Sequence, residues 1–138
     1  YHILNRTFPL PLHRNDCYFT YRNLDVERMR QAAAYLVGTH DFKSFCSIHA
    51  QVKTTIRTIY SLTVCKEQDI ITIRVTGSGF LYNMVRIIAG TLLQVGTGER
   101  SPLEMADILK AKDRAAAGPT APAHGLTMIG IEFGEYLK

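Results

Sequence analysis

The stretch TIRTIYSLTVCKEQDIITIRVTGSG, residues 55–79, decides the fold class of this 138-residue chain. Its first part, residues 55–66, is rich in β-branched side chains, and its second part, residues 69–76, alternates apolar with polar ones. Both patterns predict strands, and the short polar segment between them predicts an antiparallel hairpin. Gly77-Ser-Gly79 is expected to break the second strand.

Helices are predicted on both sides of this hairpin. Residues 24–37 place their apolar side chains on one helical face, with Asn23 or Asp25 as the N-cap. A strongly apolar helix is expected over residues 80–95. Ser101 begins another helix through a capping box, in which a glutamate follows three residues later.

The remaining segments complete the predicted layout. Residues 1–4 are predicted to be a strand and residues 5–22 a loop. Residues 39–45 are predicted to be a short turn or a single helical turn, after Gly38 has ended the preceding helix. Residues 127–133 alternate and are predicted to be a strand that joins the sheet. The sequence therefore predicts an α+β domain: one mainly antiparallel sheet with helices packed on one face and the other face free for a ligand.

The composition is that of a globular domain with a basic bias. Apolar residues make up 46% and charged residues 20%, and no apolar run reaches membrane-spanning length. The formal net charge is +4, and residues 1–57 carry eight Lys and Arg against four acidic residues. A basic first half suits a polyanionic partner, but a solvated basic surface explains it equally well. The three cysteines lack a C-x-x-C pair, which predicts reduced thiols in the cytosol.

Arg86 stands alone among apolar residues of the helix predicted over 80–95. It is the only charged residue between Arg74 and Glu99. A desolvated guanidinium needs an anion, so two interpretations remain open. Arg86 is either an active-site arginine that holds a carboxylate or phosphate, or a structural arginine paired within the core. Tyr82 is predicted to share its helical face.

Basic and aromatic side chains interleave over residues 18–45. In an RNA-binding face the arginines would contact phosphates and the rings would stack on bases. A helix with a solvated basic side fits the same pattern equally well. The candidates for RNA contact, which include two positions beside Arg86, are Arg22, Arg28, Lys43, Phe45, Tyr82 and Asn83.

Potential metal ligands and nucleophiles are also present. His13 and Cys17, together with Cys46 and His49, have the composition of a zinc site, but their spacings do not match a zinc finger. The sequence therefore predicts no metal at these residues. Cys46 and Ser44 have histidines nearby in sequence, but no nucleophile elbow surrounds either of them.

Four segments together resemble one enzyme family. They are Leu24-Asp-Val-Glu-Arg-Met29, Gly38-Thr-His-Asp-Phe-Lys-Ser-Phe45, Phe80-Leu-Tyr-Asn-Met-Val-Arg86 with Gly90, and Pro122-Ala-His-Gly-Leu126. In their order and approximate spacing they are similar to the C-terminal half of the bacterial tRNA pseudouridine synthase A family. The resemblance covers nearly the whole chain.

The resemblance implies that residues 1–138 are the C-terminal domain of a cytoplasmic enzyme with two α+β halves of an RRM- or ferredoxin-like layout. A basic cleft between the halves would admit the anticodon stem-loop of tRNA, and uridine would be isomerised to pseudouridine without a cofactor or metal. The catalytic aspartate of the family lies in a Gly-Arg-Thr-Asp motif of the N-terminal half. That motif does not occur in this chain, so the chain alone is expected to be inactive. Homodimerisation is implied as well.

The same resemblance implies roles for two residues. Arg86 corresponds to the family's active-site arginine, which would hold the catalytic carboxylate in a charge-assisted pair and keep it ionised. Tyr1 corresponds to the second tyrosine of a Tyr-x-Tyr pattern, and a shift of register would make it the family's active-site tyrosine. Two other functions were considered: a stand-alone RNA-binding module and a dimerisation domain. The sheet lacks the central basic and aromatic pattern of RRM modules.

Overall fold

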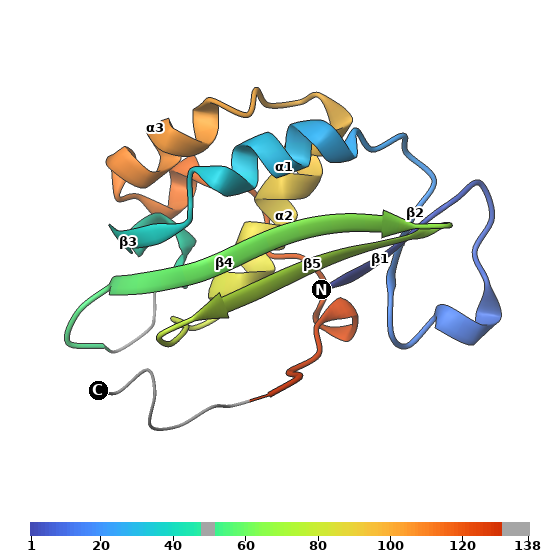
Figure 1. The fold of residues 1–138 in the computed structure, drawn as a ribbon, viewed down its shortest axis with the longest axis horizontal. Helices are drawn as coiled ribbons and strands as arrows, with labels where there is room; N and C mark the ends of the chain where they lie inside the picture. Colours follow the sequence, from blue (N-terminus) through green and yellow to red (C-terminus); the bar gives the residue numbers. More distant parts are fainter. Residues whose placement is uncertain (48–51, 131–138) are drawn as a thin grey trace.

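A five-stranded sheet in the order β2-β1-β5-β4-β3 organises the chain (Figure 1). The computed structural model describes residues 1–47 and 52–130. All strand pairs are antiparallel except β1 with β2, which is parallel. The strands are β1 (His2–Asn5), β2 (Tyr18–Thr20), β3 (Gly38–Asp41), β4 (Ile56–Glu67) and β5 (Ile70–Gly77).

The predicted hairpin of residues 55–76 is confirmed as β4 and β5. The two strands pair over nearly their whole length, and the turn between them contains Gln68 in the left-handed region at φ 54°. Successive side chains point to opposite faces of the hairpin. Val64 and Ile73 lie on the buried face, whereas Thr63 and Arg74 are exposed on the other face. The exposed face of the hairpin is therefore polar.

Three helices pack against the buried face of the sheet, as predicted (Figure 1). They are α1 (Val26–Ala34), α2 (Met84–Thr97) and α3 (Glu104–Ala111). The side chain of Asp25, rather than that of Asn23, caps α1 by accepting a hydrogen bond from the backbone of Arg28. The prediction of an α+β domain with a mainly antiparallel sheet and helices on one face is confirmed. No described helix is long and apolar enough to cross a membrane.

Several boundaries differ from the prediction. Gly38 does not end α1, which already ends before Tyr35; it begins β3 at φ 109°, where glycine is favoured. The turn expected over residues 39–45 is a strand followed by a single 3-10 turn, because Thr39 and Asp41 pair with β4.

Two further expectations about strands were wrong. The loop over residues 5–22 contains β2, which is only three residues long and too short to show a periodic pattern. Apolar and polar residues alternate over residues 127–130, but these residues do not pair with the sheet and therefore form no strand. The rest of the strand predicted over 127–133 lies outside the described residues.

The segment that follows α3 crosses α2 at Gly90. A Cβ at this position would lie 1.8 Å from the carbonyl oxygen of Pro119, so only glycine fits there. The backbone amide of Gly118 donates to the hydroxyl of Thr91 (2.9 Å), which fixes the crossing. This contact carries residues 119–125 past the N-terminal end of α2.

Candidate active site around Arg86

Arg86 lies in the first turn of α2 and is half-buried. Its Nε donates to the carbonyl oxygen of Ala121 (2.8 Å), and its Nη1 donates to Oδ1 of Asn83 (3.2 Å). The amide of Ala121 donates in return to the carbonyl oxygen of Arg86 (3.0 Å). The side chain is thus fixed at two points by neutral partners.

No carboxylate among the described residues forms an ion pair with Arg86. Asp107 and Asp113, which are both exposed, are not paired with it. A guanidinium has five N–H donors, and two of them are used by the described residues. The side chain therefore keeps capacity for an anion.

Asn83 holds Arg86 in place. It precedes α2 in the left-handed conformation (φ 60°, ψ 10°), which asparagine tolerates better than most residues. The side-chain oxygen of Asn83 accepts from Arg86, and its amide nitrogen donates to the hydroxyl of Ser47 (3.0 Å). Asn83 therefore connects the arginine to the segment that follows the turn at residues 43–45.

Tyr1 lies close to this site. Its hydroxyl donates to the carbonyl oxygen of Pro122 (2.7 Å), and its ring packs against Gly125, where a Cβ would lie 2.6 Å from the ring. Burial raises the pKa of the Tyr1 hydroxyl above its usual value, and the nearby positive charge of Arg86 opposes this shift only in part. In this structure the hydroxyl serves to hold the segment of residues 122–125.

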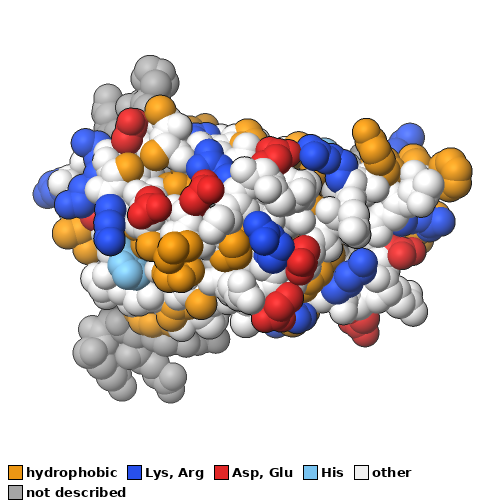
Figure 2. Space-filling model, turned by 90° about the horizontal axis from the view of Figure 1, so that it is seen from above, with side chains coloured by type: hydrophobic (Ala, Val, Ile, Leu, Met, Phe, Trp, Pro, Cys, Tyr) orange, Lys and Arg blue, Asp and Glu red, His pale blue; other side chains and the backbone are white. Residues whose placement is uncertain are grey.

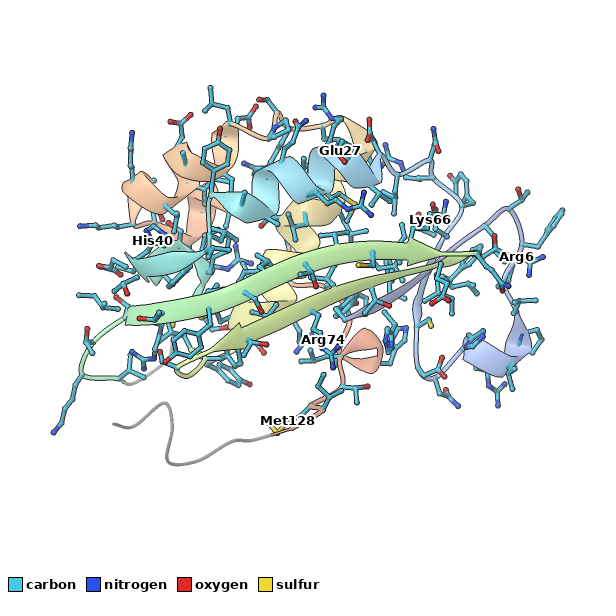
Figure 3. All side chains as sticks on the ribbon, in the orientation of Figure 1. Arg6, Glu27, His40, Lys66, Arg74 and Met128 are labelled. Carbon is cyan, nitrogen blue, oxygen red and sulfur yellow. The ribbon has the colours of Figure 1, made fainter. Side chains whose placement is uncertain are left out.

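A cavity of about 490 Å³ adjoins Arg86 at the edge of β5. Its walls are mostly apolar, and Arg74, Asn83 and Arg86 contribute polar groups. Figure 3 shows Arg74 and Met128, two of its lining residues, on the side of the hairpin away from Glu27 of α1. On this edge of β5, the N-terminal segment of the chain pairs only as far as Ile73. Beyond it, no strand among the described residues pairs with this edge of residues 74–77. The cavity therefore combines an anion-binding side chain with an open sheet edge.

The residues predicted to contact RNA divide into two groups. Tyr82, which is 66% exposed, lies with Asn83 just before the N-terminal end of α2, whereas Lys43 is exposed in the 3-10 turn of residues 43–45. Arg22 pairs with Glu99, and Arg28 binds backbone carbonyls at the opposite end of α2. The remaining candidate, Phe45, is fully buried and packs edge-on to a neighbouring ring. The structure therefore does not bring all six candidates to one surface.

Seen from the helix side in Figure 2, several Lys and Arg side chains gather at the left end, and over the rest of this face Lys and Arg are interspersed with Asp and Glu. On α1, for example, Arg30 pairs with Glu27 (3.4 Å). The basic bias of the first half of the sequence is thus partly neutralised on this side.

Sequence reasoning missed two partners of the site, Ser47 and Ala121. Ser47 contributes its hydroxyl and Ala121 its backbone carbonyl, and neither residue type carries a sequence signal of its own. Ser44, considered earlier as a nucleophile, has a structural role: its hydroxyl donates to Ile108 and accepts from the amide of Asp113. Burial raises the pKa of the Cys46 thiol, which opposes thiolate formation.

Comparisons with known proteins show the family to which the chain belongs. A family described as tRNA pseudouridine synthase matches residues 32–134. The tRNA pseudouridine synthase A of Thermoanaerobacter sp. (strain X514) is 51% identical over 131 residues, which cover 95% of this chain and 54% of that protein. The protein of the same name from Bacillus subtilis (strain 168) is 54% identical over 116 residues, or 84% of this chain and 47% of that protein. The chain spans about half the length of the curated relatives it matches. A match over this much of the chain places it in the tRNA pseudouridine synthase family.

Proposed function

We propose that this chain is the C-terminal half of a tRNA pseudouridine synthase that isomerises uridine in the anticodon stem-loop of tRNA. The observation that carries the proposal is Arg86, which is held by neutral groups beside a cavity and has no carboxylate partner among the described residues. A half-buried guanidinium is stabilised when an anion meets it. The proposed anion is the catalytic aspartate of the other half.

The chemistry explains why such an arginine is useful. The isomerisation breaks the bond between N1 of uracil and C1′ of the ribose, turns the base and joins C5 to C1′. The C5 hydrogen leaves as a proton, and N1 takes up a proton in its place. No electrons are gained or lost, so the reaction is balanced without an oxidant. Arg86 would keep the aspartate ionised by lowering its pKa and would fix its orientation through charge-assisted hydrogen bonds.

The open edge of β5 supports the proposed position of the other half. Residues 74–77 pair with β4 on one edge, and in the part of the chain that the structure describes no strand pairs with their other edge, next to the cavity lined by Arg86. Exposed sheet edges readily pair with further strands. A second half that pairs or packs along this edge would bring its aspartate toward Arg86 and cover the apolar walls of the cavity.

Of the six residues predicted to contact RNA, the exposed Lys43 and Tyr82 keep this role in the proposal, and Tyr82 immediately precedes Asn83 of the site. Asn83 is assigned to positioning Arg86 instead. Because only half of the cleft would be present, the isolated chain should bind an anticodon stem-loop weakly, with an affinity that falls as salt rises. Nanomolar binding that does not change with salt would instead favour a stand-alone RNA-binding module.

The decisive experiment measures release of tritium from tRNA labelled at C5 of uridine. Protein that contains this chain together with its other half should release tritium, whereas the 138-residue chain alone should release none. Absence of release from the two-half protein, on tRNAs with uridine in the anticodon arm, would overturn the proposed activity. Release by the isolated chain would overturn its assignment as half of the active site.

A further inference from the structure

A second cluster of reactive side chains lies in the segment that connects β1 to β2. His13 Nδ1, a carboxylate oxygen of Asp16 and Cys17 Sγ all lie within 4.8 Å of one another. The distance between His13 Nδ1 and Asp16 Oδ1 is 3.1 Å. The backbone creates this arrangement, because the amides of Asp16 and Cys17 both donate to the carbonyl oxygen of His13.

A fourth group, His2, adjoins the cluster. In the parallel pairing of β1 with β2, Ile3 is opposite Tyr18, so His2 and Cys17 are neighbours one position earlier. The charges of Asp16 and His13 both act on the His2 imidazole. One imidazole, one carboxylate and one thiol therefore form the cluster, and His2 lies beside it on the neighbouring strand.

We propose that His13, Asp16 and Cys17 form a site for a divalent transition metal, preferably zinc, with His2 as the fourth ligand. Nitrogen, sulfur and carboxylate oxygen are the ligands that zinc takes in proteins. Ligand atoms around a tetrahedral zinc lie roughly 3.3–3.8 Å apart, given bond lengths of about 2.0–2.3 Å. The three atoms, which lie within 4.8 Å of one another, therefore need to close by at most about 1.0–1.5 Å to hold the ion.

This inference departs from the expectation drawn from the sequence alone. That expectation grouped His13 and Cys17 with Cys46 and His49, whose spacing does not suit zinc. In the structure Cys46 follows the turn at residues 43–45, near Tyr82, and His49 lies outside the described residues. Asp16 completes the cluster through the turn at residues 13–17, and the pairing of β1 with β2 brings His2 beside it.

Hydrogen bonding alone is the competing explanation for the cluster. The Asp16 carboxylate accepts from both His13 and Cys17, and this would stabilise the turn without a metal. The two explanations differ in the state of the thiol: a hydrogen bond requires its proton, whereas a metal binds the thiolate. A spectroscopic probe of thiolate coordination therefore separates them.

The test is a Co²⁺ titration of the 138-residue chain, followed through the charge-transfer absorption that only thiolate ligands produce, with Zn²⁺ as competitor. The expected result is one equivalent of Co²⁺, displaced by Zn²⁺, together with a rise in Tm on addition of Zn²⁺. Cys17→Ser should remove the absorption band. His13→Gln, at a less buried position, should keep the fold and weaken binding by at least about 10-fold.

Cys65→Ser is the matched control, because Cys65 is exposed on β4 and belongs to no described metal cluster. Its titration should equal that of the unchanged chain. A chain that gives no charge-transfer band, or a band that disappears in Cys65→Ser and persists in Cys17→Ser, would overturn the proposal. So would unchanged affinity in a folded His13→Gln variant.

Discussion

Both ends of α2 are held by arginines, but the two ends use them differently. At the C-terminal end, Arg28 donates to the carbonyl oxygens of Val95 and Arg100. Arg100 in turn donates to the side chain of Gln94 and to the carbonyl oxygen of Ala116. Cations are favoured at this end by the helix dipole and by its free carbonyls. These arginines complete the fold.

At the N-terminal end, Arg86 occupies the first turn of α2, where the helix dipole disfavours a positive charge. Two of its five donors are used by the described residues, and the rest of the side chain adjoins a cavity. Arg28 and Arg86 are both partly buried, so partial burial alone does not identify a functional arginine. The informative features are its unfavourable position in the helix and its unused donors.

The largest effect is expected from replacing Arg86 with leucine in protein that contains both halves. Turnover should fall by about 10²- to 10⁴-fold, which corresponds to the roughly 3–5 kcal/mol lost when one member of a buried ion pair is removed. The free energy of unfolding should change by less than about 1 kcal/mol, because relief of the unfavourable dipole interaction offsets two lost hydrogen bonds. Tritium release and urea unfolding measure the two quantities.

Arg86→Lys serves as the companion variant. It keeps the charge but loses the planar fork, so it should retain only a small part of the activity. Near-normal turnover in Arg86→Leu would mean that both ends of α2 carry purely structural arginines, and the contrast between them would fail.

Replacing Arg100 with methionine should have the opposite profile. The side chain of Gln94 and the carbonyl oxygen of Ala116 would lose their donor, which should lower the free energy of unfolding by about 2 kcal/mol. Turnover per folded molecule should not change. The control is Arg22→Met, which removes an exposed pair with Glu99 and should cost less than about 1 kcal/mol. A loss of turnover in folded Arg100→Met would show that this end also serves catalysis.

Asn83 allows a finer test of how Arg86 is held. Asn83→Gly tolerates the left-handed backbone while removing both side-chain hydrogen bonds, and should lower turnover by about 10-fold, equal to roughly 1.4 kcal/mol. Asn83→Ala should lower turnover equally, but should also lose about 1 kcal/mol of stability from backbone strain. If stability drops in both variants and turnover in neither, Asn83 has only a structural role.

The smallest effect is expected from Tyr1→Phe. Loss of the hydrogen bond to Pro122 should lower the free energy of unfolding by about 1 kcal/mol and leave turnover within about twofold of normal. Steady-state kinetics on the two-half protein, with thermal unfolding beside it, would measure this. A collapse of turnover in a folded variant would instead place the Tyr1 hydroxyl in the chemistry.

The sequence predicted the hairpin and the first two helices because each is long enough for a periodic pattern to repeat, and it predicted the third helix from the capping box at Ser101. It could not predict β2 or β3, which are short strands whose pairing depends on distant partners. Alternation over residues 127–130 was misleading, since a period of two fits any extended segment. Pairing along a sheet is a tertiary property that local pattern does not contain.

For the site, the sequence identified Arg86 as a charge in apolar surroundings but left its role open. What distinguishes it from Arg28 is the set of atoms around each guanidinium, and most of these are backbone carbonyls, which every residue has. For the cluster of His13, Asp16 and Cys17, the sequence identified only the histidine and the cysteine as possible ligands. Their spacing matches no known metal motif, so the cluster could not be predicted.

The pairing of β1 with β5 joins parts of the chain that are synthesised far apart in time. The backbone nitrogen of Tyr1 donates to the carbonyl oxygen of Ile73, across 72 positions of sequence. At translation rates of roughly 5–20 residues per second, β1 waits roughly 4–14 s for its partner. During that interval Ile3 and Leu4, which are almost fully buried in the finished fold, have no sheet to cover them. The β4–β5 hairpin closes locally and is expected to form early, so insertion of β1 beside it is expected to limit the rate of folding.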